Sequence, residues 1–149
     1  MAVEIERKFL VKGEFRHLAI KKTDIVQTYL TIDSDKTIRV RTAEGKAILT
    51  IKSRHYLSPI SRNEWETEIP LTDALEIMKI CLPGKVVKTR YLVPHDNHTF
   101  EVDEFHDKNE GLVIAEMELE SEHEHFEKPE WLGEEVTGKP EYYSANLIK

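Results

Sequence analysis

The first residues with a chemically suggestive spacing are Glu4, Glu6 and Lys8, which alternate with positions such as Ile5. Successive side chains of a β-strand point to opposite faces, so a strand over residues 3–11 places two carboxylates and an ammonium on one face. Such a row is costly to bury unless it meets opposite charge or a metal ion. For this motif alone, a half-exposed strand with its charged face toward water is the simpler interpretation.

The same alternation recurs along the chain, and on several segments the charges are grouped by sign. The groups are Arg39 and Arg41, Lys88 and Arg90, Glu101 and Asp103, and Glu116, Glu118 and Glu120, whereas the segment 61–69 places Arg62 on one face with Glu64, Glu66 and Glu68. A solvated face more often mixes both signs, so the grouping favours charged faces that converge on an enclosed lumen. The pattern leaves the ordinary arrangement, with charges outside and apolar residues inside, equally open.

Converging faces of this kind would have a fairly specific chemistry. Guanidinium groups match phosphate oxygens bidentately, and a lysine adds a point charge. Clustered carboxylates provide the hard oxygen ligands that Mg²⁺ and Mn²⁺ prefer. A lumen with both sets suits a short, highly charged phosphate chain together with a divalent metal. No G-x-x-x-x-G-K-[ST] phosphate loop is present.

Eight strand-like segments must position these residues, and most of them are joined by short turns. We expect strands at residues 3–11, 25–32, 37–42, 48–52, 61–69, 85–93, 99–105 and 112–120. This pattern predicts an antiparallel sheet that closes so that no edge is left. The clearest helix spans residues 72–82, with Thr72 as its N-cap and an apolar stripe that includes Leu75. The tail from residue 121 onward is predicted to cover an apolar outer surface as one or two short helices.

Composition limits the class of protein. The 149 residues suffice for one domain, which we place at 1–149. A net charge of −7 argues against nucleic acid as a partner. We find no apolar run of the ~20 residues that a membrane span needs and no apolar leader. The single cysteine, Cys81, cannot form an intramolecular disulfide. We expect a soluble, cytoplasmic protein without a membrane partner.

Other kinds of site have weak support. His95 and His98, like His123 and His125, lie in polar segments without cysteine partners, so surface histidines are a better interpretation than zinc ligands. No G-x-S-x-G motif supports a hydrolytic triad.

Several motifs in a fixed order resemble those of the CYTH superfamily, the triphosphate tunnel metalloenzymes, and in particular its short bacterial branch of inorganic triphosphatases. The motifs are E-x-E-x-K at residues 4–8, T-I-R-V-R at 37–41, L-T-I-K at 49–52, K-T-R-Y at 88–91, E-V-D-E-F at 101–105, A-E-M-E-L-E at 115–120 and W-L-G-E-E-V-T at 131–137. The resemblance covers essentially the whole chain.

The resemblance implies a mainly β (α+β) fold: an eight-stranded antiparallel closed barrel with a charged lumen and a few short outer helices. It implies binding of a triphosphate by Lys8, Arg39, Arg41, Lys52, Lys88 and Arg90, of which Lys8, Lys52, Arg39 and Arg41 are also expected to be catalytic. Mg²⁺ or Mn²⁺, as two ions, would be bound by Glu4, Glu6, Asp103, Glu116 and Glu118. Further lumen members implied are Glu64, Glu66, Glu101 and Glu120, with Tyr29 near the site.

The activity that the resemblance implies is metal-dependent hydrolysis of the terminal phosphoanhydride of a triphosphate, most of all inorganic triphosphate, by in-line attack of water. A class IV-type adenylate cyclase and a thiamine triphosphatase stay open as alternatives, as does a non-catalytic binding module for polyphosphate or nucleotide. The sequence leaves open the physiological substrate, the preferred metal, the carboxylates that serve each metal ion, and the oligomeric state, for which a homodimer is one option.

Overall fold

In the computed structural model, residues 2–55 and 60–148 are described, and most of them lie in strands. The strands are β1 (Ala2–Val11), β2 (Lys21–Ile32), β3 (Lys36–Ala43), β4 (Lys46–Arg54), β5 (Ser61–Ile69), β6 (Val86–His95), β7 (His98–Phe105), β8 (Val113–Leu119) and β9 (Leu132–Glu135). One α-helix, α1 (Leu71–Met78), follows β5. Short 3₁₀ turns lie at η1 (Arg16–Leu18), η2 (Asp107–Asn109), η3 (Pro140–Tyr142) and η4 (Ser144–Asn146).

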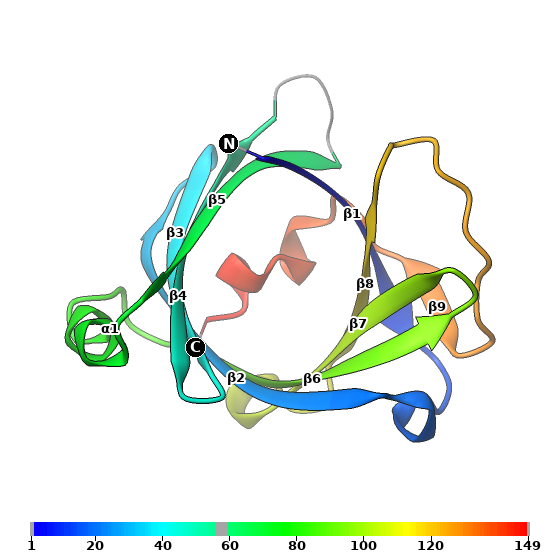
Figure 1. Ribbon diagram of the computed structural model, residues 1–149, viewed down its shortest axis with the longest axis horizontal. Coiled ribbons are helices and arrows are strands. Elements are labelled where there is room, and N and C mark those ends of the chain that lie inside the picture. The colour runs from blue at the N-terminus through cyan, green and yellow to red at the C-terminus, as the bar shows by residue number, and fades with distance from the viewer. Residues whose placement is uncertain (1, 56–59, 149) are drawn as a thin grey trace.

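Strands β1 to β8 form a closed antiparallel barrel, as the resemblance implied (Figure 1). The order around the barrel is β5-β4-β3-β2-β6-β7-β8-β1, and pairing of β1 with β5 closes the ring. The first half of β1 pairs with β5, and its second half pairs with β9. Strand β9 therefore lies on the same edge of β1 as β5 does. Closure leaves β1 paired on both sides, so the strand that carries the E-x-E-x-K motif is held at the centre of the sheet.

The barrel has its charges inside and much of its apolar core outside, which settles the two arrangements that the pattern left open. On β1, Phe9 belongs to the largest buried apolar cluster, whereas Glu4, Glu6 and Lys8 alternate with it and face the lumen. On β6, Tyr91 and Val93 join the same outer cluster. The apolar faces are buried because segments outside the barrel cover them.

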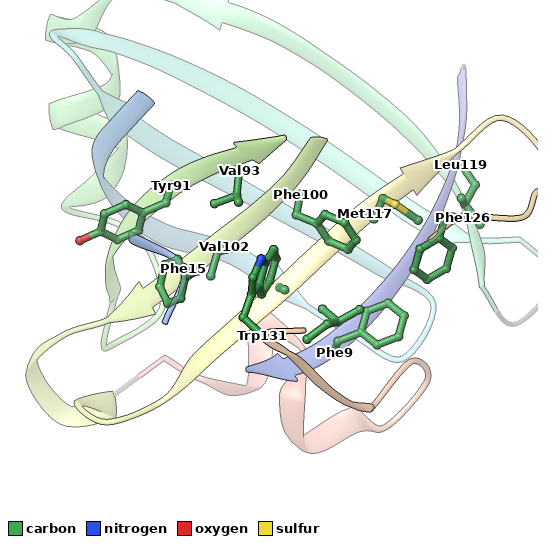
Figure 2. Packing of buried hydrophobic residues seen from close by; sticks show 12 residues of the cluster. Phe9, Phe15, Tyr91, Val93, Phe100, Val102, Met117, Leu119, Phe126 and Trp131 are labelled. Carbon is green, nitrogen blue, oxygen red and sulfur yellow. The ribbon is translucent and has the colours of Figure 1, made fainter. Parts of the chain in front are cut away.

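Figure 2 shows the aromatic side chains that cover the outer face of β1, β6, β7 and β8. Trp131 contacts Phe100 edge to face, with 5.2 Å between ring centroids, and Phe126 lies 5.7 Å from Phe9. Phe15, from the segment before β2, contacts Tyr91 at 5.3 Å. Edge-to-face pairs of this kind stabilise a packed surface beyond their burial alone. The covering segments come from both ends of the chain.

Helix α1 covers a second outer surface, on β3 and β4, and it is shorter than the sequence predicted. Ala74 packs there with Val40 and Ala47, and the last turn adds Met78. The helix begins at Leu71 after the N-cap Pro70, so the prediction of Thr72 as N-cap is wrong. The predicted apolar stripe also included Leu75, which is exposed. In residues 2–55 and 60–148, no helix has the length and hydrophobicity needed to traverse a bilayer.

The end of the chain closes one end of the barrel instead of covering its outer wall, as Figure 1 shows for the red segment. Leu147 packs with Val86, Phe105 and Ile114 on the interior face of the strands. Asn109 in η2 donates a hydrogen bond to the Leu147 carbonyl at 2.6 Å. Residues 126–132 cover the outer wall as predicted. The turns η3 and η4 lie at the end of the barrel instead, so the prediction is wrong for this last part of the chain.

Arg7, the one charged residue on the apolar side of β1, forms an ion pair with Glu135 on β9. Its guanidinium donates two hydrogen bonds to that carboxylate, at 2.6 and 2.9 Å, and Thr137 donates a third at 2.7 Å. The hydrogen bonds from Arg7 lower the pKa of Glu135. Because both partners are partly exposed, we expect Glu135→Gln to cost about 1 kcal/mol of unfolding free energy at pH 7.

The sign of the pH dependence follows from the lowered pKa of Glu135. Its contribution is present above the ordinary carboxyl pKa and is lost as the pH falls through the lower, folded value. Urea unfolding of wild type and Glu135→Gln at pH 7 and at pH values below 4 measures the difference. Glu134→Gln, at an exposed neighbour, is the control. A difference that persists unchanged in acid would contradict the assignment.

Candidate active site

The interior face of the barrel gathers residues from seven strands that lie far apart in the sequence. It carries all of the predicted phosphate-binding and metal-binding residues: Glu4, Glu6 and Lys8 on β1, Arg39 and Arg41 on β3, Lys52 on β4, Lys88 and Arg90 on β6, Asp103 on β7, and Glu116 and Glu118 on β8, with Glu64 on β5 beside Lys52. Cross-strand register explains the gathering, since Lys8 lies opposite Glu116 and Arg90 lies opposite Asp103. Residues two apart on each strand extend the row along the lumen.

Lys52 forms one group of charges with Glu4 and Glu64. Its Nζ lies 2.9 Å from Glu4 Oε1 and 3.5 Å from Glu64 Oε2. Burial opposes the Lys52 ammonium, but the carboxylates of Glu6 and Glu4 outweigh it and raise the pKa of Lys52. Burial, and then a hydrogen bond with Glu4, raise the pKa of Glu64 to about 7. This group therefore holds one cation beside two carboxyl groups, of which Glu64 keeps its proton to a higher pH than Glu4 because the pKa of Glu64 is raised and that of Glu4 is lowered.

Asp103 is the centre of a second group, with Lys88 and Arg90. Arg90 donates to both carboxylate oxygens, at 2.8 and 2.9 Å, and Lys88 Nζ lies 2.8 Å from Oδ2. Burial alone would raise the pKa of Asp103, but the two cations hold it low. Burial also lowers the pKa of Lys88 to about 8 against the attraction of Asp103. Both Asp103 oxygens are thus engaged by cations, and Arg90 also contacts Glu101 at 2.7 Å.

Lys8 links the barrel wall to the end of the chain. Its Nζ donates a hydrogen bond to the Tyr142 carbonyl at 3.0 Å and lies 3.6 Å from Glu116 Oε1. The Tyr143 ring lies beside the same ammonium, with 5.5 Å from Nζ to the centroid, and Arg62 lies 4.8 Å from that centroid. Burial opposes ionisation of Glu116, but Lys8 and the cations of β6 outweigh it and hold its pKa far below the usual range.

Glu6 and Glu118 are carboxylates that lie directly opposite each other on β1 and β8. Like charges in this position are destabilising. Burial, and next the charge of Glu116, raise the pKa of Glu6 well above its usual value, and burial with the charge of Glu4 raises that of Glu118. Both residues therefore disfavour their ionised form in the absence of a cation. A divalent ion would remove this cost, so these oxygen donors fit Mg²⁺ or Mn²⁺.

The carboxylates are not assembled as a ready coordination shell. Within residues 2–55 and 60–148, no three Asp, Glu, His or Cys side chains are arranged to hold a metal ion. The ion pairs explain this arrangement, because Glu4 is in contact with Lys52, and Glu116 with Lys8. An anion that replaced the carboxylates as partner of the lysines would leave these carboxylates free to bind a metal ion.

Arg39 presents an unused donor to the lumen. Its buried Nε has no hydrogen-bond partner in the part of the chain that the structure describes, and the same is true of the Oε1 of Gln27. Gln27 is fully buried, and its Nε2 lies 3.5 Å from the hydroxyl of Tyr29. Tyr29 is itself buried and faces Arg39 across β2 and β3. A free guanidinium donor suits an anion, which is consistent with the predicted role of Arg39.

The lumen also contains residues that were not selected from the sequence. Arg62 continues the alternating row of β5 toward the closed end and could have been found from its spacing to Glu64. Gln27 is a neutral polar residue on a strand that contains several other polar residues, so the sequence gave little sign of its place in the lumen. Tyr142 and Tyr143 gave none, because their place depends on how the end of the chain folds back. Glu120 lies one residue beyond β8, so it is not part of the strand rows that form the lumen wall.

The opposite end of the lumen is open and widens into a cavity of about 220 Å³. Arg41, Arg90 and Glu101 line it together with aliphatic residues such as Ile48 and Leu92. None of the described residues that line it is aromatic. The cavity therefore gives access to Arg41 and Arg90. The predicted surface histidines are outside this space: His98 pairs with Glu124 on the outer side.

Comparisons with known proteins agree with this architecture. A CYTH domain is matched over residues 2–149. The chain is 45% identical to an inorganic triphosphatase of Acetivibrio thermocellus, over 100% of this chain and 95% of the relative. It is 31% identical to an inorganic triphosphatase of known crystal structure, with a TM-score of 0.67 over 99% of this chain and 95% of that one. A protein of Pyrococcus horikoshii OT3 shares the fold, with a TM-score of 0.61, 23% identity, and coverage of 80% and 79%.

Proposed function

Because the chain belongs to the CYTH family, we propose that it is a metal-dependent inorganic triphosphatase whose reaction takes place in the lumen of the barrel. The observation that carries the proposal is the convergence of six cationic side chains and a set of facing carboxylates within one enclosed space. Several cationic side chains together can bind the oxygens of a short phosphate chain, and carboxylates can bind the divalent metal ion that accompanies it.

Lys8, Arg39, Arg41, Lys52, Lys88 and Arg90 hold the triphosphate in this proposal. Arg39 supports the assignment with its unpaired Nε, and Lys8 and Lys52 support it because substrate oxygens can replace their present carboxylate partners. Of these residues, Lys8, Lys52, Arg39 and Arg41 are assigned to the reacting phosphoryl group. Fixed cations stabilise the charge that develops on its equatorial oxygens and on the leaving diphosphate. Tyr29, Glu66 and Glu101 complete the lumen wall.

Glu4, Glu6, Glu116 and Glu118 are the residues that would hold Mg²⁺ or Mn²⁺, as two ions. Bound there, the metal would supply a Lewis acid for phosphate oxygens and a water of lowered pKa as nucleophile. Glu64, which contacts Lys52 together with Glu4, is available as a further ligand. For Asp103 we propose a different role from the one that the resemblance implied. Because Arg90 and Lys88 engage both of its oxygens, it positions these two cations.

The reaction in this proposal is in-line attack of water on a terminal phosphorus, with cleavage of the bond to the bridging oxygen. The products are orthophosphate and diphosphate, and the proton of the attacking water is released to the lumen carboxylates or to solvent. The lumen residues contribute mainly by positioning and by electrostatic stabilisation, which supply most of what phosphoryl transfer requires.

The direct test is phosphate release from inorganic triphosphate, ATP and thiamine triphosphate, each with Mg²⁺, with Mn²⁺ and with a chelator. Metal-dependent release that is fastest from inorganic triphosphate supports the proposal. Formation of cAMP from ATP would identify a cyclase instead, and preference for thiamine triphosphate would change the substrate. Tight binding of triphosphate without any release would indicate a binding module.

Lys52→Ala is expected to reduce turnover of inorganic triphosphate about 100-fold, the typical effect of removing one preorganised electrostatic contact to a transition state. The substitution also leaves Glu4 without its ion-pair partner. Steady-state phosphate release measures the effect, with Lys79→Ala as the matched control because that lysine is exposed and pairs with a surface carboxylate, Glu76. Equal activity in wild type and Lys52→Ala would remove Lys52 from the site.

The remaining expectations on partners belong to the same proposal. The substrate is a small triphosphate, with no nucleic acid or membrane as partner, and the protein acts in the cytoplasm as a single domain. We also propose that it is a homodimer. The net charge of −7 supports the exclusion of nucleic acid.

A further inference from the structure

The outer face of the first half of β2, residues 21–26, is a stretch of barrel wall between α1 and η1. Helix α1 packs on β3, on β4 and on the second half of β2 at Leu30, to one side of this stretch, and η1 lies to the other (Figure 1). Side chains on this face alternate with those of the lumen, so Ile20, Lys22, Asp24 and Val26 form one row. Ile20 continues the pairing of β2, because its N–H donates to the Leu92 carbonyl at 2.9 Å. The row is apolar, basic, acidic and apolar in order.

The row has an exposed side chain, Ile20, at one end and a groove beside Val26 at the other. Ile20 is 72% exposed, and Leu18 in η1 beside it is 45% exposed. A groove of about 450 Å³ lies around Val26, with Val87 and Leu71 among its lining residues. Polar residues, among them Asp24, Glu44 and His106, also line the groove. Aliphatic surface that is exposed, on Ile20 and in the groove alike, is unfavourable in water. An aliphatic side chain from another molecule would relieve both.

The two charges between these ends, Lys22 and Asp24, are opposite in sign and would match the same two residues of a second copy of the chain. Lys22 and Asp24 are both exposed and point outward from neighbouring positions of the row. Asp24 is fixed by a hydrogen bond of 2.8 Å from the hydroxyl of Thr89, which in turn lies 2.7 Å from His106 Nε2. The Lys22 ammonium lies over the Tyr91 ring at 5.8 Å. Both charges are therefore held on the face and do not pair with each other.

We propose that two copies of the chain associate through this face about a two-fold axis that passes over Thr23 at right angles to β2. The axis places Lys22 of each copy against Asp24 of its partner and Ile20 of each copy over the groove at Val26. Ile20 and Val26 are six residues apart, roughly 20 Å on a strand, so both ends engage at once. An isologous interface of this type needs self-complementary surfaces, and the order of this row satisfies that condition.

This inference specifies the homodimer proposed above and is independent of the activity, because each lumen lies within one barrel. The catalytic groups named above face the opposite side of the wall from Lys22 and Asp24. Phosphate release and molecular mass therefore test separate statements. Loss of the dimer with activity retained would leave the proposed function intact.

Sedimentation velocity across a range of protein concentrations tests the interface with charge reversals. Wild type is expected to sediment with twice the mass of the chain. Lys22→Asp and Asp24→Lys, as single variants, each bring like charges together twice, and we expect each to weaken the dimer about 100-fold. The double variant Lys22→Asp/Asp24→Lys restores opposite charges and should restore the dimer. Ile20→Asp should also give a monomer.

Circular dichroism and phosphate release serve as controls, because all of these side chains are exposed and the variants should stay folded and active. A monomeric wild type would overturn the proposal. So would dimeric single variants, since the interface would then lie on another surface. A double variant that stays monomeric while both single variants are monomeric would overturn the pairing of Lys22 with Asp24.

Discussion

Glu6→Gln is expected to lower metal-dependent turnover about a thousand-fold while making the metal-free protein more stable. The loss corresponds to about 4 kcal/mol of transition-state stabilisation, within the range that a metal ion contributes to phosphoryl transfer. Glu6 lies opposite Glu118 and close to Glu116, and its raised pKa shows that the ionised form is disfavoured without a cation. A neutral amide of the same shape removes this repulsion. A ligand site that costs stability when empty commonly shows this trade-off.

Thermal unfolding with chelator present and Mn²⁺ binding followed by electron paramagnetic resonance measure the two effects. We expect a Tm increase of roughly 3 °C, which corresponds to about 1 kcal/mol for a chain of this size. Mn²⁺ binding should weaken together with turnover. Glu76→Gln, on the exposed surface of α1, is the matched control for removal of one carboxylate. A variant that keeps turnover within tenfold of wild type would show that Glu6 does not hold the metal.

Asp103→Asn is expected to have the opposite effect on stability, with a loss of about 3 kcal/mol of unfolding free energy. Removal of one partner from a buried ion pair leaves the other charge uncompensated, which is more costly than the pair itself. Here the substitution affects both Lys88 and Arg90, and the side chains of Lys88 and Asp103 are almost completely buried. Turnover should fall as well, because these two cations then lose their fixed positions.

Mn²⁺ binding distinguishes the role proposed for Asp103 from that of a metal ligand. As a residue that positions cations, Asp103 can be replaced by Asn without loss of Mn²⁺ affinity, in contrast to Glu6→Gln. Urea unfolding gives the stability change, and the same resonance experiment gives the affinity. Loss of Mn²⁺ binding at unchanged stability would restore the role that the resemblance implied. The two variants thus form a pair: Glu6→Gln should raise stability and weaken Mn²⁺ binding, whereas Asp103→Asn should lower stability and leave Mn²⁺ binding unchanged.

The sequence by itself determined the strands and the residues that share a face. The period of two is a local property, so Glu4, Glu6 and Lys8 must lie together on any strand that contains them. The expected strands agree with β1 to β8 to within a few residues, and only β2 begins clearly earlier than predicted. The order of motifs and the family resemblance then indicated both the closed barrel and its charged lumen. The helix was less well predicted, because Pro70 and packing on Ala47 decided its extent.

The pattern of the strands could not decide which side of the sheet is inside, and only the tertiary structure decided which charges are partners. The alternation is the same whether the charged faces line the lumen or face the solvent. The actual arrangement depends on closure between β1 and β5 and on the segments that cover the outer wall. The pairing of Asp103 with Arg90 depends on the register between β6 and β7, and the residue pattern within either strand does not specify that register. The contact of Tyr142 with Lys8 joins the two ends of the chain. Local periodicity contains no information on contacts at such separation, because they are fixed by how the whole barrel closes and packs.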